Sequence, residues 1–234
     1  MTLEHVDILF RLIVFIFAIS IHESAHAWMA NRCGDPTARM LGRITLNPIK
    51  HIDPIGTVVM PLIAMYTGFP TIGWAKPTPV DPRNFKNQVV DDILTSVVGP
   101  GSNFVLAVLA VVILLIVSAV SPLGSSIVHL IPLVYPNHMD VLTNQTNSVL
   151  MPIALLAYEF MVINIVLGVF NLIPVPPLDG SHVIRHFLPE TILKVYDNIG
   201  IFGLLALVYL GGNFLGRLIF PVINFFNSFL VGRG

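Results

Sequence analysis

The chain has 234 residues, of which 55% are hydrophobic and only 11% are charged, against roughly 25% charged in an ordinary soluble domain. A compact soluble fold of this length could not bury so many apolar side chains, so the composition excludes a soluble enzyme and predicts a lipid bilayer as the surroundings. The formal net charge is -1, without the basic stripe that binding to a phosphate backbone requires, so we expect no nucleic-acid partner.

Three stretches are apolar over about 20 residues, the length that a helix needs to cross the hydrocarbon core. They run from Ile8 to Met29, from Ile93 to Val120 and from Val149 to Val169. Nearer the C-terminus, the apolar stretches 199–210 and 214–231 predict one or two further crossings. We therefore expect an all-α polytopic membrane protein with about 4–6 transmembrane helices.

The apolar stretch Ile55–Phe69 is shorter and is interrupted by two glycines and a proline, which favours a re-entrant segment over a full crossing. The placement of Lys and Arg agrees with this interpretation. Segments 31–53 and 70–92 carry seven basic residues between them, whereas segment 121–149 carries none. If Ile55–Phe69 does not cross, both basic segments lie in the cytosol, as the positive-inside rule requires.

Residues 41–48 alternate apolar and polar side chains and end in the turn residues Asn47 and Pro48. This pattern predicts a short strand, so we expect a small membrane-associated β element beside the helices. The chain shows no internal repeat or linker. We therefore expect residues 1–234 to form a single membrane-embedded domain, with a core at about 8–190 and C-terminal helices at about 191–231.

Residues 22–26 read His-Glu-Ser-Ala-His, an H-E-x-x-H sequence within the first predicted helix. A spacing of four places the imidazoles of His22 and His26 about 40° apart around the helix axis and one turn along it, so both can bind one zinc ion. Glu23 then lies beside the metal, where it can take a proton from zinc-bound water and pass it to the leaving amine. Polar residues at a helix end are the alternative, but three ionisable groups in an apolar helix are costly and favour a functional site.

A catalytic zinc needs three protein ligands and an open position for water. The chain has a single cysteine, Cys33, so these ligands must be His and carboxylate side chains. Asp179 is the best candidate for the third, because it follows the third predicted span, in the Pro-rich stretch 171–180. Prolines deny this stretch helical hydrogen bonds, so its backbone must be satisfied by protein, water or substrate. A helix terminator with a turn aspartate is the alternative interpretation.

The H-E-x-x-H sequence in an N-terminal membrane helix, followed by N-x-x-P-x-P-P-L-D-G at residues 171–180, resembles the site-2 protease family of intramembrane zinc metalloproteases. The likeness runs from about residue 12 to residue 190. Further segments that resemble the family are 42–48, 51–57, 73–77 and 99–103. Many relatives carry PDZ or CBS modules, for which this chain has no room, so it is similar to the compact type without them.

The resemblance implies cleavage of peptide bonds in the transmembrane segments of substrate proteins, the reaction of regulated intramembrane proteolysis. It implies one Zn²⁺ per chain on His22, His26 and Asp179, with Glu23 activating the water that attacks the scissile carbonyl. It also suggests that Asn171 and Asn103 bind or position the substrate, with helix capping or packing as the alternative for Asn103. We expect an integral protein of a prokaryotic plasma membrane, with its active site toward the cytosol.

A transmembrane substrate must unwind before water can reach its carbonyl groups, so a strand at residues 42–47 could hold it by strand addition. The alternative function is a divalent-metal transporter or channel in which His22, His26, Asp179 and Glu159 line a passage. Glu23 discriminates between the two functions, because a transport site needs no base. A catalytically silent membrane scaffold is the third possibility, which the complete set of ligands and base argues against.

His182 and His186 are also spaced by four and follow Asp179 closely. They could form a second metal pair, but they lack an adjacent glutamate, so we favour an ordinary interfacial helix face. Glu159 lies too far along the third span to bind the same zinc, and we expect it to contact a neighbouring helix or line a water path.

Overall fold

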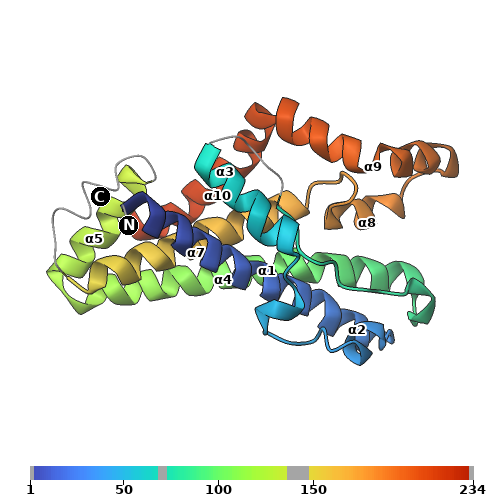
Figure 1. The fold of residues 1–234 in the computed structure, drawn as a ribbon, viewed down its shortest axis with the longest axis horizontal. Coiled ribbons are helices and arrows are strands. Elements are labelled where there is room, and N and C mark those ends of the chain that lie inside the picture. Colours follow the sequence, from blue (N-terminus) through green and yellow to red (C-terminus); the bar gives the residue numbers. More distant parts are fainter. Residues whose placement is uncertain (1–2, 68–72, 136–147, 232–234) are drawn as a thin grey trace.

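The computed structural model describes residues 3–67, 73–135 and 148–231. Four of the described helices carry the candidate membrane-spanning stretches, and all four are labelled in Figure 1. They are α1 (Leu3–Cys33), α4 (Gln88–Val120), α7 (Leu150–Asn171) and α10 (Gly212–Val231). Each contains a stretch long and apolar enough to cross a membrane, and in α1 this stretch is Phe10–Cys33. The three predicted spans are thus confirmed as helices, with ends displaced by a few residues.

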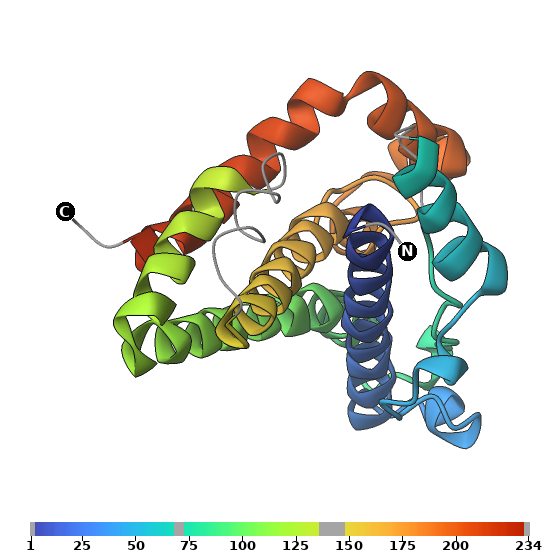
Figure 2. The same cartoon turned by 60° about the vertical axis from the view of Figure 1, so that its left-hand side comes forward.

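The central helix is α4, whose most extensive contacts are with α7 and α1. It begins where the side chain of Asn87 accepts a hydrogen bond from the amide of Val90 at 3.2 Å, a normal N-terminal cap. Figure 2 shows α1, α4 and α7 grouped together, with α3 (Met60–Thr67) beside α1. The main apolar core joins α4, α7 and α10, with Leu114, Met161 and Phe226 among its buried members.

Segment 121–149, after α4, contains a helix that the sequence did not predict. This helix, α5 (Pro122–Val134), begins with the hydroxyl of Ser121 accepting from the amide of Gly124 at 3.0 Å. Ile127, Val128 and Ile131 share one face of α5 and are buried in the main core. Residues 136–147 of this segment lie outside the described residues.

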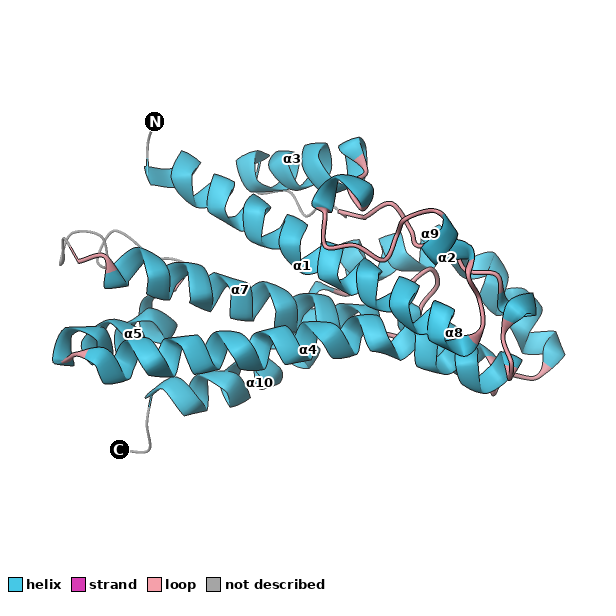
Figure 3. Cartoon of the chain, turned by 90° about the horizontal axis from the view of Figure 1, so that it is seen from below, coloured by secondary structure: helices cyan, strands magenta, loops and turns pink. Residues whose placement is uncertain are grey.

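The expected β element at residues 41–48 is wrong, because the described ranges 3–67, 73–135 and 148–231 contain helices and loops and no strand (Figure 3). A strand needs a partner ladder for its backbone. Here side chains take that place: the carbonyl of Thr45 accepts from the hydroxyl of Ser24 and lies 2.8 Å from Nε2 of His51. Gly42 also has a positive φ of 65°, which turns the chain.

Residues 54–67 form a π-helical turn, η2 (Pro54–Val59), that continues into α3. The carboxylate of Asp53 begins the turn by accepting from the amides of Ile55 at 3.0 Å and Gly56 at 2.7 Å. The helical stretch is too short to count among the spans. The re-entrant placement stays a prediction, and residues 68 and 69 lie outside the described residues.

The C-terminal region holds α9 (Glu190–Leu210) and α10, which meet at Gly211. Helix α9 is broken at Gly200, whose φ is 43°, and its two halves are bent by 68°. The described chain therefore has four candidate spans, or five if the bent pair is one span. Figure 3 places α2 (Thr37–Met40) and α8 (Asp179–Arg185) at one end of the long helices and α5 at the other.

Candidate metal centre and active site

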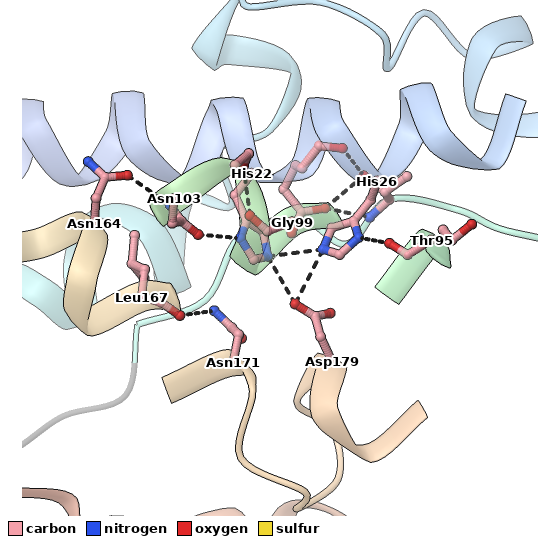
Figure 4. A network of polar contacts seen from close by, with 12 residues as sticks. His22, His26, Thr95, Gly99, Asn103, Asn164, Leu167, Asn171 and Asp179 are labelled. Atoms are coloured by element: carbon pink, nitrogen blue, oxygen red, sulfur yellow. Dashed lines mark hydrogen bonds and ion pairs between the residues drawn. The ribbon is translucent and has the colours of Figure 1, made fainter. Parts of the chain in front are cut away.

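The two histidines of the H-E-x-x-H sequence project from one face of α1, and both are buried. Their Nε2 atoms lie 3.0 Å apart. On the far side of each ring, Nδ1 has an acceptor from α4. His22 Nδ1 lies 2.7 Å from Oδ1 of Asn103, and His26 Nδ1 lies 2.6 Å from the carbonyl oxygen of Thr95. The rings are therefore held from behind with their Nε2 atoms facing a common point (Figure 4).

The hydrogen bonds behind the rings decide where each imidazole carries its proton. Asn164 donates from Nδ2 to the carbonyl of Phe160, which leaves its Oδ1 to accept from Nδ2 of Asn103 at 2.8 Å. Oδ1 of Asn103 is consequently an acceptor, and His22 donates to it from Nδ1. The Thr95 carbonyl can only accept, so His26 also donates from Nδ1. In a neutral ring the remaining Nε2 then carries a lone pair, as a metal ligand must.

Asp179, the first residue of α8, brings a carboxylate to the same point. Its Oδ2 lies 3.2 Å from Nε2 of His22 and 3.3 Å from Nε2 of His26 (Figure 4). The next residue must be glycine, because a Cβ at Gly180 would lie 2.2 Å from the carbonyl oxygen of Leu172. This close approach lets the end of α7 and the start of α8 fold against each other and aims Asp179 at α1.

The three donor atoms fit a metal ion better than they fit one another. One nitrogen or oxygen from each of His22, His26 and Asp179 lies within 4.8 Å of the other two. With both rings neutral, all three atoms are acceptors, and only a cation satisfies them together. Two imidazoles and one carboxylate are a donor set that Zn²⁺ accepts with a fourth position open for water. Gly99 lies beneath the rings, where a Cβ would come within 2.2 Å of Nε2 of His26.

Glu23 lies on the neighbouring face of α1 and is held by the extended segment that follows residue 72. Thr78 donates to Oε2 of Glu23 twice, from its amide at 2.9 Å and from its hydroxyl at 2.7 Å. The carboxylate is partly exposed, and it lines the same cleft as the two histidines. The group that could serve as a base is therefore oriented but still accessible.

The side chains of His22, His26 and Asp179 open into a cleft of about 740 Å³ between α1, α4, the end of α7 and α8. Asn171 lines the cleft, and its Nδ2 donates to the carbonyl of Leu167 in its own helix at 3.0 Å, which leaves Oδ1 to accept. Asn103 is 0% exposed and lies behind His22. The structure thus gives Asn103 a supporting contact to the ring of His22, while its expected contact to the substrate stays a prediction.

A sequence profile described as peptidase family M50 matches residues 10–210. The chain belongs to that family. The M50 match covers every residue placed above around the cleft. Among curated proteins, the chain is 32% identical over 216 residues to "Putative zinc metalloprotease YwhC" of Bacillus subtilis, a match covering 92% of this chain and 86% of that protein.

A second relative is "Putative zinc metalloprotease Rip2" of Mycolicibacterium smegmatis, 30% identical over 95 residues, which are 41% of this chain and 36% of that protein. No solved structure matches the chain. Membership of family M50 and the apolar helices make this chain a zinc metalloprotease and an integral membrane protein. The resemblance to the site-2 proteases is thereby confirmed.

Sequence reasoning named Asn103 but missed Thr95 and Asn164, and it did not foresee that Gly99 packs beneath the rings in the site of this M50 peptidase. Thr95, Gly99 and Asn103 recur every four residues, and all three face α1. The spacing is visible in the sequence, but an uncharged carbonyl or a glycine gives no sign of its partner. Asn164, in α7, was missed for the same reason.

Glu159 lies away from the candidate metal ligands. Its Oε1 is 3.5 Å from Nε of Arg11, and its side chain is 3% exposed. Arg11 precedes His22 by eleven residues, which is about 16 Å along α1. Glu159 thus contacts a neighbouring helix, which was one of the two expectations for it. This distance separates it from His22, His26 and Asp179 and weakens the transport passage that would join all four.

Proposed function

We propose that the protein is an intramembrane zinc endopeptidase that cleaves peptide bonds in the transmembrane segments of other membrane proteins. In this proposal His22, His26 and Asp179 hold one Zn²⁺, and Glu23 is the general base. The observation that carries it is the meeting of two imidazole nitrogens and a carboxylate oxygen at 3.0–3.3 Å, with the protons of both rings committed elsewhere. No other described group of three His, Cys, Asp or Glu side chains converges in this way.

Zinc, when bound, supplies a Lewis acid that polarises the scissile carbonyl and makes water acidic enough to attack at neutral pH. The carboxylate of Glu23 accepts the proton that water loses as its oxygen bonds to the carbonyl carbon. Glu23 then donates this proton to the peptide nitrogen as the carbon–nitrogen bond breaks. The two hydrogen bonds from Thr78 orient the carboxylate during both transfers.

The substrate would bind in extended form along the segment after residue 72. In this segment the amides of Trp74 and Lys76 are bonded on one side, to the carbonyls of Gly56 and His51 at 3.1 and 2.9 Å. Successive residues of an extended chain face opposite ways, so Ala75 turns its amide and carbonyl to the other side, where the described residues give it no hydrogen bond. Both Trp74 and Ala75 line the cleft.

Asn171 lines the cleft as well, on the side of α7. Its side-chain oxygen is free to accept from a substrate amide, while Ala75 can donate and accept. Main-chain hydrogen bonds of this kind would recognise the backbone of an unwound substrate and not the identity of its side chains. The proposed substrate class is therefore a transmembrane helix that has locally unwound, with little demand on its residue types.

The site is proposed to face the cytosol of a prokaryotic cell. Helices α2 and α8 lie at the same end of the long helices (Figure 3). The basic segments 31–53 and 73–92 adjoin that end, because the first runs on from the last turn of α1 and the second leads into the first turns of α4. Short loops rich in Lys and Arg remain in the cytosol. Residues 190–231 complete the single proposed domain, since Phe226 and Leu230 of α10 are buried in the core shared with α4 and α7.

The test pairs metal content with cleavage for the wild type and Glu23→Gln in detergent. Elemental analysis should find one zinc per chain in both proteins. Cleavage of a reporter transmembrane substrate should fall at least about 100-fold in the variant, because general-base catalysis supplies that much. Stoichiometric zinc with equal cleavage rates would refute the role of Glu23, and the absence of cleavage by either protein across a substrate panel would favour the transporter.

A further inference from the structure

One face of α4 touches both imidazole ligands in three successive turns. Thr95 accepts from His26, Gly99 lies beneath both rings, and Asn103 accepts from His22. The preceding turn of the same face holds Asp92, three residues before Thr95 and only 8% exposed. An acidic side chain buried there needs partners of its own.

The partners of Asp92 come from α8, the helix that carries the third ligand. Nε2 of His186 lies 2.7 Å from Oδ2 of Asp92, and Nδ1 of His182 lies 3.7 Å from Oδ1. Asp179, His182 and His186 recur at spacings of three and four, so they share one face of α8 and the residue that caps its end. The face that presents Asp179 to the histidines of α1 is therefore the face that contacts Asp92.

The cluster of Asp92, His182 and His186 is a contact between α4 and α8 and not a second metal site. Asp92 lies within hydrogen-bond distance of His186, at 2.7 Å, whereas its distance to His182 is 3.7 Å. Within residues 3–67, 73–135 and 148–231, the donors of His22, His26 and Asp179 form the group that meets within 4.8 Å, and those of Asp92 and its partners do not. The side chain of His182 is also 45% exposed and lines the cleft.

We propose that Asp92 is the positioning residue for the third zinc ligand, and that it acts through His186. The inference rests on the proposed role of Asp179. Helix α8 has seven residues and follows a stretch that contains three prolines, so it has little stability of its own. A hydrogen bond from His186 to a buried carboxylate of α4 fixes α8 in the direction that aims Asp179 at α1. One helix face thus positions all three ligands, two directly and one through α8.

The experiment measures the zinc dissociation constant of the full chain in detergent by competition with a chromophoric chelator. Removal of a contact made directly to a metal ligand changes affinity by 10–100-fold, and Asp92 acts one step further away, so Asp92→Ala should weaken zinc binding by about 10-fold. His186→Ala removes the same hydrogen bond at its partly exposed partner in α8, and it creates no cavity at the buried position in α4. Both changes break the same contact. The zinc affinity of the double variant should therefore be no lower than that of the single variant with the larger loss.

Two further variants separate positioning from general disturbance. Asp92→Asn keeps an oxygen that can accept from His186 and should recover most of the lost affinity. Asp197→Ala removes an exposed partner of Arg185, 3.4 Å away, and should leave zinc binding unchanged. The inference is overturned if Asp92→Ala and His186→Ala each bind zinc within twofold of the wild type, or if their effects multiply in the double variant. Failure of the wild type to bind zinc would instead overturn the proposed metal site.

Discussion

Substitution of Gly99 by alanine is expected to damage the metal site while leaving α4 intact. A Cβ at this position would lie 2.2 Å from Nε2 and 2.5 Å from Cε1 of His26, and 2.8 Å from Cε1 of His22. Ordinary contact begins at 3.4 Å, so Nε2 would have to move by about 1.2 Å. Metal–ligand distances tolerate about 0.2 Å. The ring cannot retreat freely, because its Nδ1 is bonded to Thr95.

We therefore expect Gly99→Ala to weaken zinc binding at least about 100-fold, or about 2.7 kcal/mol at 1.36 kcal/mol per tenfold change. Chelator competition in detergent measures the loss. Gly101→Ala is the matched control, because it makes the same change in the same helix at a position with nothing within 4 Å of the new Cβ. Both changes raise helix propensity equally. Wild-type zinc affinity in Gly99→Ala would refute the placement of the rings against α4.

The remaining predictions concern the segment that holds Glu23. Thr78→Val removes one hydroxyl donor to Glu23 and should lower kcat about fivefold without changing zinc affinity. Thr78→Ser keeps the hydroxyl and should restore kcat. A loss of zinc binding in Thr78→Val would contradict this assignment. Burial raises the pKa of Asp35, but hydrogen bonds from Thr37 and from the segment after Thr78 outweigh burial and lower that pKa. Its stabilising effect is therefore present above about pH 4 and lost as pH falls. Asp35→Asn should lower the free energy of unfolding by about 1–3 kcal/mol at pH 7, and thermal unfolding should show a smaller loss near pH 3. An equal loss of stability at both pH values would contradict the lowered pKa of Asp35.

The spans could be predicted from the sequence because each is an unbroken apolar run of the length that a bilayer demands. Helix α5 was not predicted, since the prolines at both of its ends and its short length are equally typical of a loop. The β element was predicted from alternation alone. Alternation describes which side chains are apolar, but it cannot supply the neighbouring strand, and here Ser24 and His51 occupy the carbonyl of Thr45 instead.

The candidate ligands could be named from the sequence because His, Glu and Asp are costly in an apolar setting and therefore conspicuous there. Their spacing on α1 follows from helical geometry. The supporting contacts were not predictable, because Thr95 acts through a main-chain carbonyl and Gly99 through the absence of a side chain. Asn103 was noticed, but its burial behind His22 depends on how α1 and α4 cross, which no local pattern encodes.

The distance in sequence between the ligands has a consequence for how the protein is made. His22 and His26 leave the ribosome in the first helix, and Asp179 follows His26 by about 150 residues. At about 5–20 residues per second, translation needs roughly 8–30 s to supply the third ligand. During that interval the nascent chain holds two imidazoles and a base without the carboxylate that completes the set. The proposed metal site is therefore incomplete until α7 and α8 have been synthesised and docked.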